Sequence, residues 1–305
     1  MGYLILKRLW QAVLVLIVVS ILSFLLVYLS GDPVRALVPL DATQEDMENI
    51  KIQFGLDRPI YIQYFTFVKQ ALKGDLGDSF RYRQESLGMV LQRLPATLLL
   101  VSASILLAVI ISIPLGVFTA VRKDTIYDHI GTVISLSGIS IPAFWAGILL
   151  ILFFAGYLGW LPPSGKGGLS HLILPAVANS LMIIGLLTRL TRSTMVEELD
   201  KEYIVALRAK GLPRSKIEYK HALKNSLIPI VTVIGLQFGR LLGGSVIIEN
   251  VFAWPGVGWL LYSAITLRDL PLIRAAVLVI ALMFVIINLV VDILYAFIDP
   301  KIRYS

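Results

Sequence analysis

The residues with chemical potential in this chain are polar side chains set inside long apolar stretches. Gln237 and Arg240 interrupt one stretch, Asn288 and Asp292 interrupt another, and Asn179 lies in a third. Polar and ionisable groups are costly inside a membrane, so they mark solute paths or contacts between helices. We expect Gln237 and Arg240 to border a translocation path, with Arg240 attracting an anionic group such as a carboxylate. An interhelix ion pair and a contact with a partner subunit are the alternatives for Arg240.

The other three polar residues fit structural roles better. Asn288 and Asp292 are four residues apart and therefore share one helix face. We expect both, and Asn179, to hydrogen-bond to neighbouring helices or to a partner chain. A proton relay through Asp292 is the rival interpretation.

Catalytic chemistry is not indicated. The chain has no cysteine, which excludes thiol chemistry and iron–sulfur clusters. Its three histidines, at positions 129, 171 and 221, are scattered. The nearest approach to a phosphate-binding P-loop has Gly167 where serine or threonine is required. The sequence therefore predicts that this chain is no enzyme and holds neither a cofactor nor a metal.

The elements that position the polar residues are membrane-spanning helices. The chain has 305 residues, of which 57% are hydrophobic and 15% charged, whereas soluble domains carry about 25% charged residues. A span needs about 20 apolar residues. We predict an all-α integral membrane protein with six spans, at residues 9–30, 97–121, 130–157, 172–188, 227–248 and 275–297.

The distribution of charge predicts the orientation. The net charge is +7, and residues 189–226 alone contain nine Lys/Arg and five Asp/Glu. Short loops on the opposite side carry only Lys166, Arg268 and Arg274. Basic residues collect in cytoplasmic loops, so both termini and the 189–226 stretch are expected inside. The basicity is then a matter of topology, and nucleic-acid binding is disfavoured.

Residues 31–95, expected on the outside between the first two spans, are amphipathic. Thr43 begins a capping-box-like sequence and Gly55 suits the end of the helix that follows. Pro59 suits the start of a second helix that ends at Gly74. This segment is either a docking surface for an external partner or a cap on the spans, and one surface could serve both purposes.

The inner segment at residues 197–226 predicts two short helices separated by a glycine. Asp200 suits the N-cap of a first helix over 201–210, and Gly211 suits a left-handed stop. Pro213 then opens the second helix. The first helix carries an apolar strip made of Tyr203, Ile204, Ala206 and Leu207.

Two interpretations of this segment remain open at this point. An amphipathic helix pair could lie on anionic lipid, where each basic residue contributes about 1 kcal/mol. Alternatively, the pair could fill a socket on a cytoplasmic partner. A small residue and a glycine between apolar and basic positions suit close docking.

Ordered motifs along nearly the whole chain carry a family resemblance. They are residues 74–79 (GDLGDS), 139–145 (ISIPAFW), 160–162 (WLP), 202–211 (EYIVALRAKG), 221–225 (HALKN) with Pro229, 249–258 (ENVFAWPGVG), 292–296 (DILYA), and Asp299-Pro300 with Arg303. This set resembles the permease subunits of ABC importers, and more narrowly the dipeptide/oligopeptide/nickel/glutathione permease family. The Glu-Ala-Ala of the broader importer pattern is replaced by Val205, Ala206 and Leu207.

The resemblance implies a mechanism and partners. The type I importer fold would place a 97–305 permease domain after a 1–96 segment made of the first span and the outside helices. A second homologous permease, two ATPase subunits that bind ATP and magnesium, and an external solute-binding protein would complete the complex in a prokaryotic cytoplasmic membrane. The ATPases would contact the coupling loop, at about 197–226, through Tyr203, Ile204, Ala206, Leu207, Gly211 and His221.

The implied function is import of di- or oligopeptides by alternating access. Nickel or glutathione-like solutes are the alternatives within the family, and the sequence does not name the solute. A secondary transporter is the alternative of another class. We find no clear internal repeat, and the large inner loop would be superfluous in such a protein.

Overall fold

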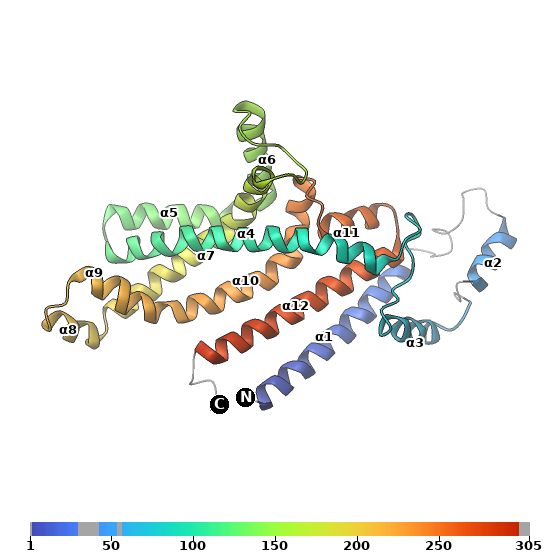
Figure 1. The fold of residues 1–305 in the computed structure, drawn as a ribbon, viewed down its shortest axis with the longest axis horizontal. Coiled ribbons are helices and arrows are strands. Elements are labelled where there is room, and N and C mark those ends of the chain that lie inside the picture. Colours follow the sequence, from blue (N-terminus) through green and yellow to red (C-terminus); the bar gives the residue numbers. More distant parts are fainter. Residues whose placement is uncertain (1, 30–42, 54–56, 299–305) are drawn as a thin grey trace. The chain divides into compact units, whose positions relative to one another are not determined.

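The computed structural model describes residues 2–29, 43–53 and 57–298, and every regular element in these ranges is a helix (Figure 1). The α-helices are α1 Gly2–Leu29, α2 Gln44–Gln53, α3 Ile60–Ala71, α4 Ser86–Val121, α5 Ile126–Ser140, α6 Ala143–Leu150, α7 Leu169–Leu199, α8 Glu202–Ala209, α9 Arg214–Lys216, α10 Leu223–Val251, α11 Val257–Thr266 and α12 Leu270–Ile298. Two π-helical segments, η1 Ile151–Tyr157 and η2 Ile217–Ala222, continue α6 and lead into α10.

Five stretches of the described chain are long and apolar enough to cross a membrane. They lie in α1, in α4, in α7, at Arg214–Val251 and in α12. A sixth crossing exists only if α5 and the α6–η1 helix count as one span, because the chain bends by 100° between them.

The span predicted at 130–157 is therefore broken into two helices. Ile141 and Pro142 both adopt extended backbone, with ψ angles of 121° and 130°. A residue before proline is pushed away from the α conformation, and proline lacks the N–H that would continue the ladder. Helix α5 consequently ends at Ser140, and a new helix starts in another direction.

Three further elements differ from the sequence prediction. Helix α7 extends to Leu199, well beyond the apolar segment expected to end at residue 188. The second short helix of the inner segment is not separate, because α9, η2 and α10 run on without a break. Helix α11 was not predicted, since its ten residues are too few for a span.

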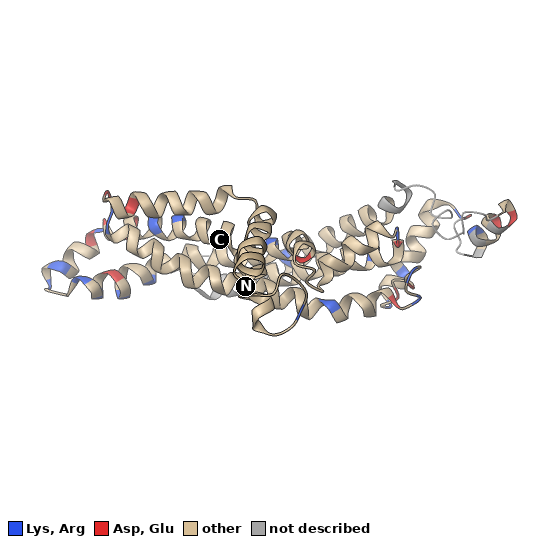
Figure 2. Ribbon diagram, turned by 90° about the horizontal axis from the view of Figure 1, so that it is seen from above, with Lys and Arg blue, Asp and Glu red and all other residues tan. Residues whose placement is uncertain are grey.

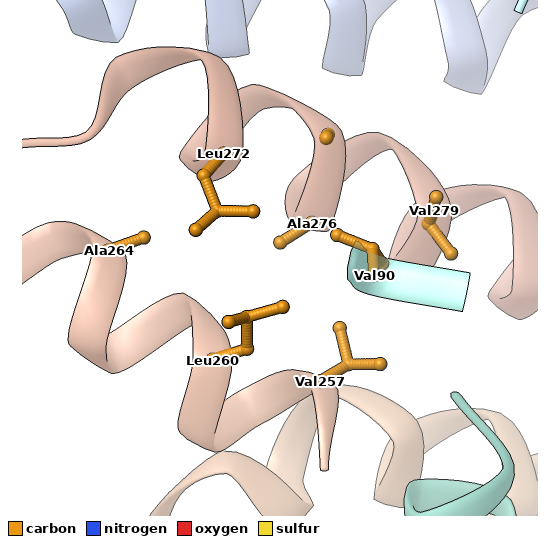
Figure 3. Close-up of a cluster of buried hydrophobic side chains, with 8 residues drawn as sticks. Val90, Val257, Leu260, Ala264, Leu272, Ala276 and Val279 are labelled. Carbon is orange, nitrogen blue, oxygen red and sulfur yellow. The ribbon is translucent and has the colours of Figure 1, made fainter. Parts of the chain in front are cut away.

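The chain divides into two compact units, Met1–Thr97 with Pro255–Ile286, and Leu98–Trp254 with Ile287–Ser305. Apolar residues of α4, α11 and α12 form the core of the first unit (Figure 3). Val257, Leu260 and Ala264 repeat at helical spacing along α11 and face a matching stripe on α12.

Helix α3 packs on α1 within the first unit. Phe24 meets Tyr64 edge-on at 5.5 Å between ring centroids, and Phe67 lies at 6.0 Å. The Tyr64 hydroxyl is 2.8 Å from Ser20 Oγ. Helices α2 and α3 lie where the sequence predicts two helices, and α3 begins after Pro59 as expected. Gly55, the expected stop of the first of them, lies outside the described residues.

Glycines bring α4, α5 and α7 together in the second unit. A Cβ at Gly138 would lie 2.8 Å from the Leu181 carbonyl oxygen, and one at Gly185 would lie 2.8 Å from Ile139 Cγ1 and closer still to the Ser135 carbonyl. Such small residues allow helix backbones to approach closely.

A buried ion pair reinforces this packing. Arg192 of α7 donates from Nε and Nη2 to the two carboxylate oxygens of Asp128 on α5, at 2.5 and 2.6 Å. Asp128 is 2% exposed. A bidentate pair of this kind fixes orientation as well as distance.

Candidate functional site

The inner segment is built around α8. Its N-cap is Lys201, whose backbone is extended, with φ −75° and ψ 149°. Asp200 instead completes the last turn of α7, because its N–H bonds back to the Val196 carbonyl at 3.2 Å. The prediction of Asp200 as the N-cap is therefore wrong.

Gly211 ends α8 as predicted, in the left-handed region at φ +74°. The Leu212 N–H donates to the Leu207 carbonyl at 3.3 Å, and the Gly211 N–H donates to the Arg208 carbonyl at 2.9 Å. These two bonds form a Schellman motif, with Leu207 and Leu212 as its hydrophobic pair.

The predicted apolar strip of α8 divides between two faces. Ile204 is fully buried, and Tyr203 and Leu207 are partly buried beside it. The cluster that receives them comes from α4, α7 and η2 and consists of Val117, Ala120, Met195, Ile217 and Ala222. Ala206 is exposed instead.

The exposed face of α8 carries small apolar residues. Val205 is 61% exposed, and Ala206 and Ala209 are exposed with it. Val205 and Ala209 are one turn apart, so they lie on one face. Neither residue was among the predicted ATPase contacts, although their four-residue spacing was the available signal. The packed face holds α8 in place, and the other face is exposed.

Tyr203 is the centre of a polar network. Its hydroxyl donates to Glu198 Oε2 of α7 at 2.8 Å and accepts from Asn225 Nδ2 of α10 at 3.1 Å. Lys201 forms an ion pair with the same glutamate. Burial, and after it the hydrogen bond to Glu198, raises the pKa of the Tyr203 hydroxyl. The group therefore stays protonated and remains a donor at neutral pH.

Arg214 links the second half of the segment to α4. Its Nε donates to Glu218 at 2.6 Å, and its Nη2 donates to the Val121 carbonyl at the end of α4, at 3.3 Å. His221 is half-buried in η2, and its Nε2 has no hydrogen-bond partner in the part of the chain that the structure describes. The segment is thus attached to α4, α7 and α10 at once.

The two residues expected along a translocation path lie in different environments. Gln237 is 5% exposed, whereas Arg240 is exposed. Among the side chains that the structure describes, none forms a hydrogen bond or ion pair with Arg240. A Cβ at Gly243 or Gly244, one turn further along α10, would meet nothing within 4 Å. Open space therefore lies beside α10 one turn after Arg240.

Of the three polar residues expected to bond to neighbouring helices, the structure describes the side chains of Asn179 and Asn288. Asn179 of α7 donates to Ser104 Oγ of α4 at 3.2 Å, within the buried interior. Asn288 is half-buried and has a polar or electrostatic partner. The side chain of Asp292 lies outside the described set. Among the residues described, no group of three His, Cys, Asp or Glu side chains is arranged to hold a metal.

Comparison with known proteins identifies the family. The pattern described as binding-protein-dependent transport system inner membrane component matches residues 112–304, and its N-terminal counterpart matches residues 1–101. The glutathione transport system permease protein GsiC of Escherichia coli O6:H1 is 42% identical over 302 residues, 99% of each chain, and that of Salmonella choleraesuis is 40% identical over the same length and coverage. A structure of the MetNI methionine ABC transporter in an inward facing conformation has a TM-score of 0.56 at 18% identity, over 69% of this chain and 96% of that one, which is a likeness of fold. The chain therefore belongs to the family of binding-protein-dependent inner membrane components, the multi-pass permease subunits of ABC importers.

Proposed function

We propose that this permease subunit imports short peptides, with the tripeptide glutathione as the first solute to test. The relatives at 42% and 40% identity are named as glutathione permeases, which supports this choice. Family membership leaves a secondary transporter without support. The observation that carries the proposed mechanism is α8, a short helix seated on one face and open on the other.

The orientation and partners belong to the same proposal. Both termini and α8 lie on the cytoplasmic side, and α2, α3 and the loop before α4 lie outside. The excess of basic residues between 189 and 226 supports this orientation, and Figure 2 shows basic residues at the turn between α8 and α9. A second, homologous permease, two ATPases that bind ATP and magnesium, and an external binding protein complete the transporter. The division into 1–96 and 97–305 is part of this proposal.

ATP acts on this chain through the coupling loop at residues 197–226. Closure of the ATPase dimer moves α8, whose exposed Val205, Ala206 and Ala209 fill a socket on the ATPase. Leu207 and Gly211 keep the helix folded, and Tyr203 and Ile204 attach it to the spans. The energy of ATP binding thereby biases the spans between inward-open and outward-open states.

Replacing Gly211 by valine tests this docking. A β-branched residue in the left-handed conformation costs about 1–2 kcal/mol, and no neighbour within 4 Å adds to that cost. The C-terminal end of α8 should fray. Either less ATPase should then co-purify with the permease, or ATP hydrolysis by the ATPase should no longer depend on the permease. Gly211→Asn is the matched control, because asparagine tolerates this conformation. Unchanged association and coupling in Gly211→Val would contradict the docking assignment.

Arg240 gives the proposed path its chemistry. Its guanidinium can bind a carboxylate through two parallel hydrogen bonds, and glutathione carries two carboxylates. The free space beside Gly243 and Gly244 leaves room for such a group. We propose that Arg240 attracts the carboxylate of the solute during passage and that Gln237, which is buried about one turn earlier in α10, supports the contact between helices.

Glutathione import by a transporter that carries Arg240→Gln tests this role of Arg240. A hydrogen bond to a charged group contributes about 1.5–3 kcal/mol, so we expect a loss of about tenfold or more in glutathione import. Arg240→Lys keeps the positive charge but lacks the two parallel N–H donors of the guanidinium, so its glutathione import should fall by less. Uptake of labelled glutathione into proteoliposomes containing the complete transporter measures this. Unchanged uptake by Arg240→Gln with intact assembly would remove the idea. Competition by a dipeptide, an oligopeptide and nickel then ranks the solutes.

A further inference from the structure

One hydroxyl joins three helices at the base of α8. Tyr203 donates to Glu198 at the end of α7 and accepts from Asn225 at the start of α10, at 2.8 and 3.1 Å. Both spans therefore meet α8 through one side chain. The hydroxyl donates one hydrogen bond and accepts the other, so the loss of either partner removes one of its two bonds.

The apolar seat of α8 cannot supply the same constraint. Ile204 is fully buried among side chains of α4, α7 and η2. Such burial is favourable but non-directional, so it holds Ile204 in its cluster without fixing the exact direction of the helix axis. Hydrogen bonds weaken steeply when their geometry is lost, and the Tyr203 bonds therefore fix the direction of α8.

We infer that Tyr203 is a positioning residue that locks α8 to α7 and α10, so that a displacement of α8 reaches both spans as one movement. This inference rests on the proposed function, in which α8 receives the motion of the ATPases. The Tyr203 ring packs against the cluster of α4, α7 and η2. The hydroxyl couples the displacement of α8 to α7 and α10.

The test removes the hydroxyl and keeps the ring. The chain has no native cysteine, so a cysteine at Gly243, where a side chain meets nothing within 4 Å, can report the movement of α10 through maleimide labelling. In the complete transporter, ATP should change the labelling rate of this reporter. When Tyr203→Phe is added, the two hydrogen bonds are lost. We therefore expect the ATP-dependent change in the labelling rate of the cysteine, divided by the ATP hydrolysed, to be about five- to tenfold smaller.

Matched variants separate positioning from general damage. Tyr219→Phe removes an exposed hydroxyl of the same segment and should leave the labelling change intact. Glu198→Gln keeps an acceptor for Tyr203 and should retain coupling, whereas Glu198→Ala should lose it. Asn225→Ala combined with Tyr203→Phe should be no worse than the worse single variant, because both act through one hydroxyl. Additive defects would overturn the shared-network assignment.

The outcomes also distinguish this inference from the proposed function. Ala206→Cys on the exposed face should cross-link to an ATPase subunit whether or not Tyr203 is changed. If it does so and Tyr203→Phe leaves the labelling change per ATP unaltered, the positioning role is overturned and the docking stands. If Ala206→Cys does not cross-link, the proposed docking fails and the inference falls with it. If it cross-links but ATP never changes the reporter in the transporter with Tyr203 intact, the docking stands and the inference that α8 moves α10 is overturned.

Discussion

Replacing Gly185 by alanine is expected to destabilise the transporter by about 1–3 kcal/mol, the usual range for overpacking a tight interior. The added methyl group would lie 2.8 Å from Ile139 Cγ1 and closer to the Ser135 carbonyl. Backbone atoms cannot move aside as a flexible side chain can. Helices α5 and α7 must therefore separate, which also disturbs the Asp128–Arg192 pair between them.

Gly244 provides a control with the opposite expectation. It lies in a membrane-crossing helix as well, but a Cβ there would meet nothing within 4 Å. Gly244→Ala should be neutral or stabilising by up to about 1 kcal/mol, through helix propensity alone. Thermal unfolding of the two purified variants, compared with the parent transporter, measures the difference. Equal stabilities would show that the α5–α7 crossing is not as close as the structure has it.

Removing the carboxylate of Asp269 is expected to cost about 3–5 kcal/mol, because several hydrogen bonds to a charged acceptor are lost and each contributes about 1.5–3 kcal/mol. Asp269 is 1% exposed. It accepts from Ser79 Oγ at 2.5 Å and from the backbone N–H groups of Phe80 and Arg81 at 3.2 Å each. In Asp269→Ala, these three donors of the loop before α4 lose their acceptor.

Limited proteolysis within residues 74–85, together with thermal unfolding, measures this loss. Asp78→Ala, an exposed aspartate in the same loop, is the control and should change neither quantity. Asp269→Asn keeps one acceptor and should fall between the two. Since we propose that this loop lies on the outside, Asp269→Ala should also weaken association with the binding protein. Equal protection of the loop in Asp269→Ala and Asp78→Ala would contradict the role of Asp269 in holding this loop.

Local signals in the sequence determined the class, the family and several helix ends. The excess of apolar residues required a membrane protein, and the ordered motifs indicated an ABC importer permease, as the relatives confirm. Pro59 and Gly211 marked the start of α3 and the end of α8, because proline and glycine restrict the backbone within a few residues of themselves. Signals of this kind act over one turn and can be read without knowing the fold.

Contacts between distant segments were decided by the tertiary structure alone. Ser79 and Asp269 are 190 residues apart, and Asp128 and Arg192 are 64 apart. The direction taken after Pro142 and the outward position of Ala206 likewise depend on which helix faces meet. Periodicity shows that a helix has an apolar stripe, but several partners can cover such a stripe equally well. Only the close approach at Gly138 and Gly185, and the burial of Ile204 beside α4 and α7, select one arrangement.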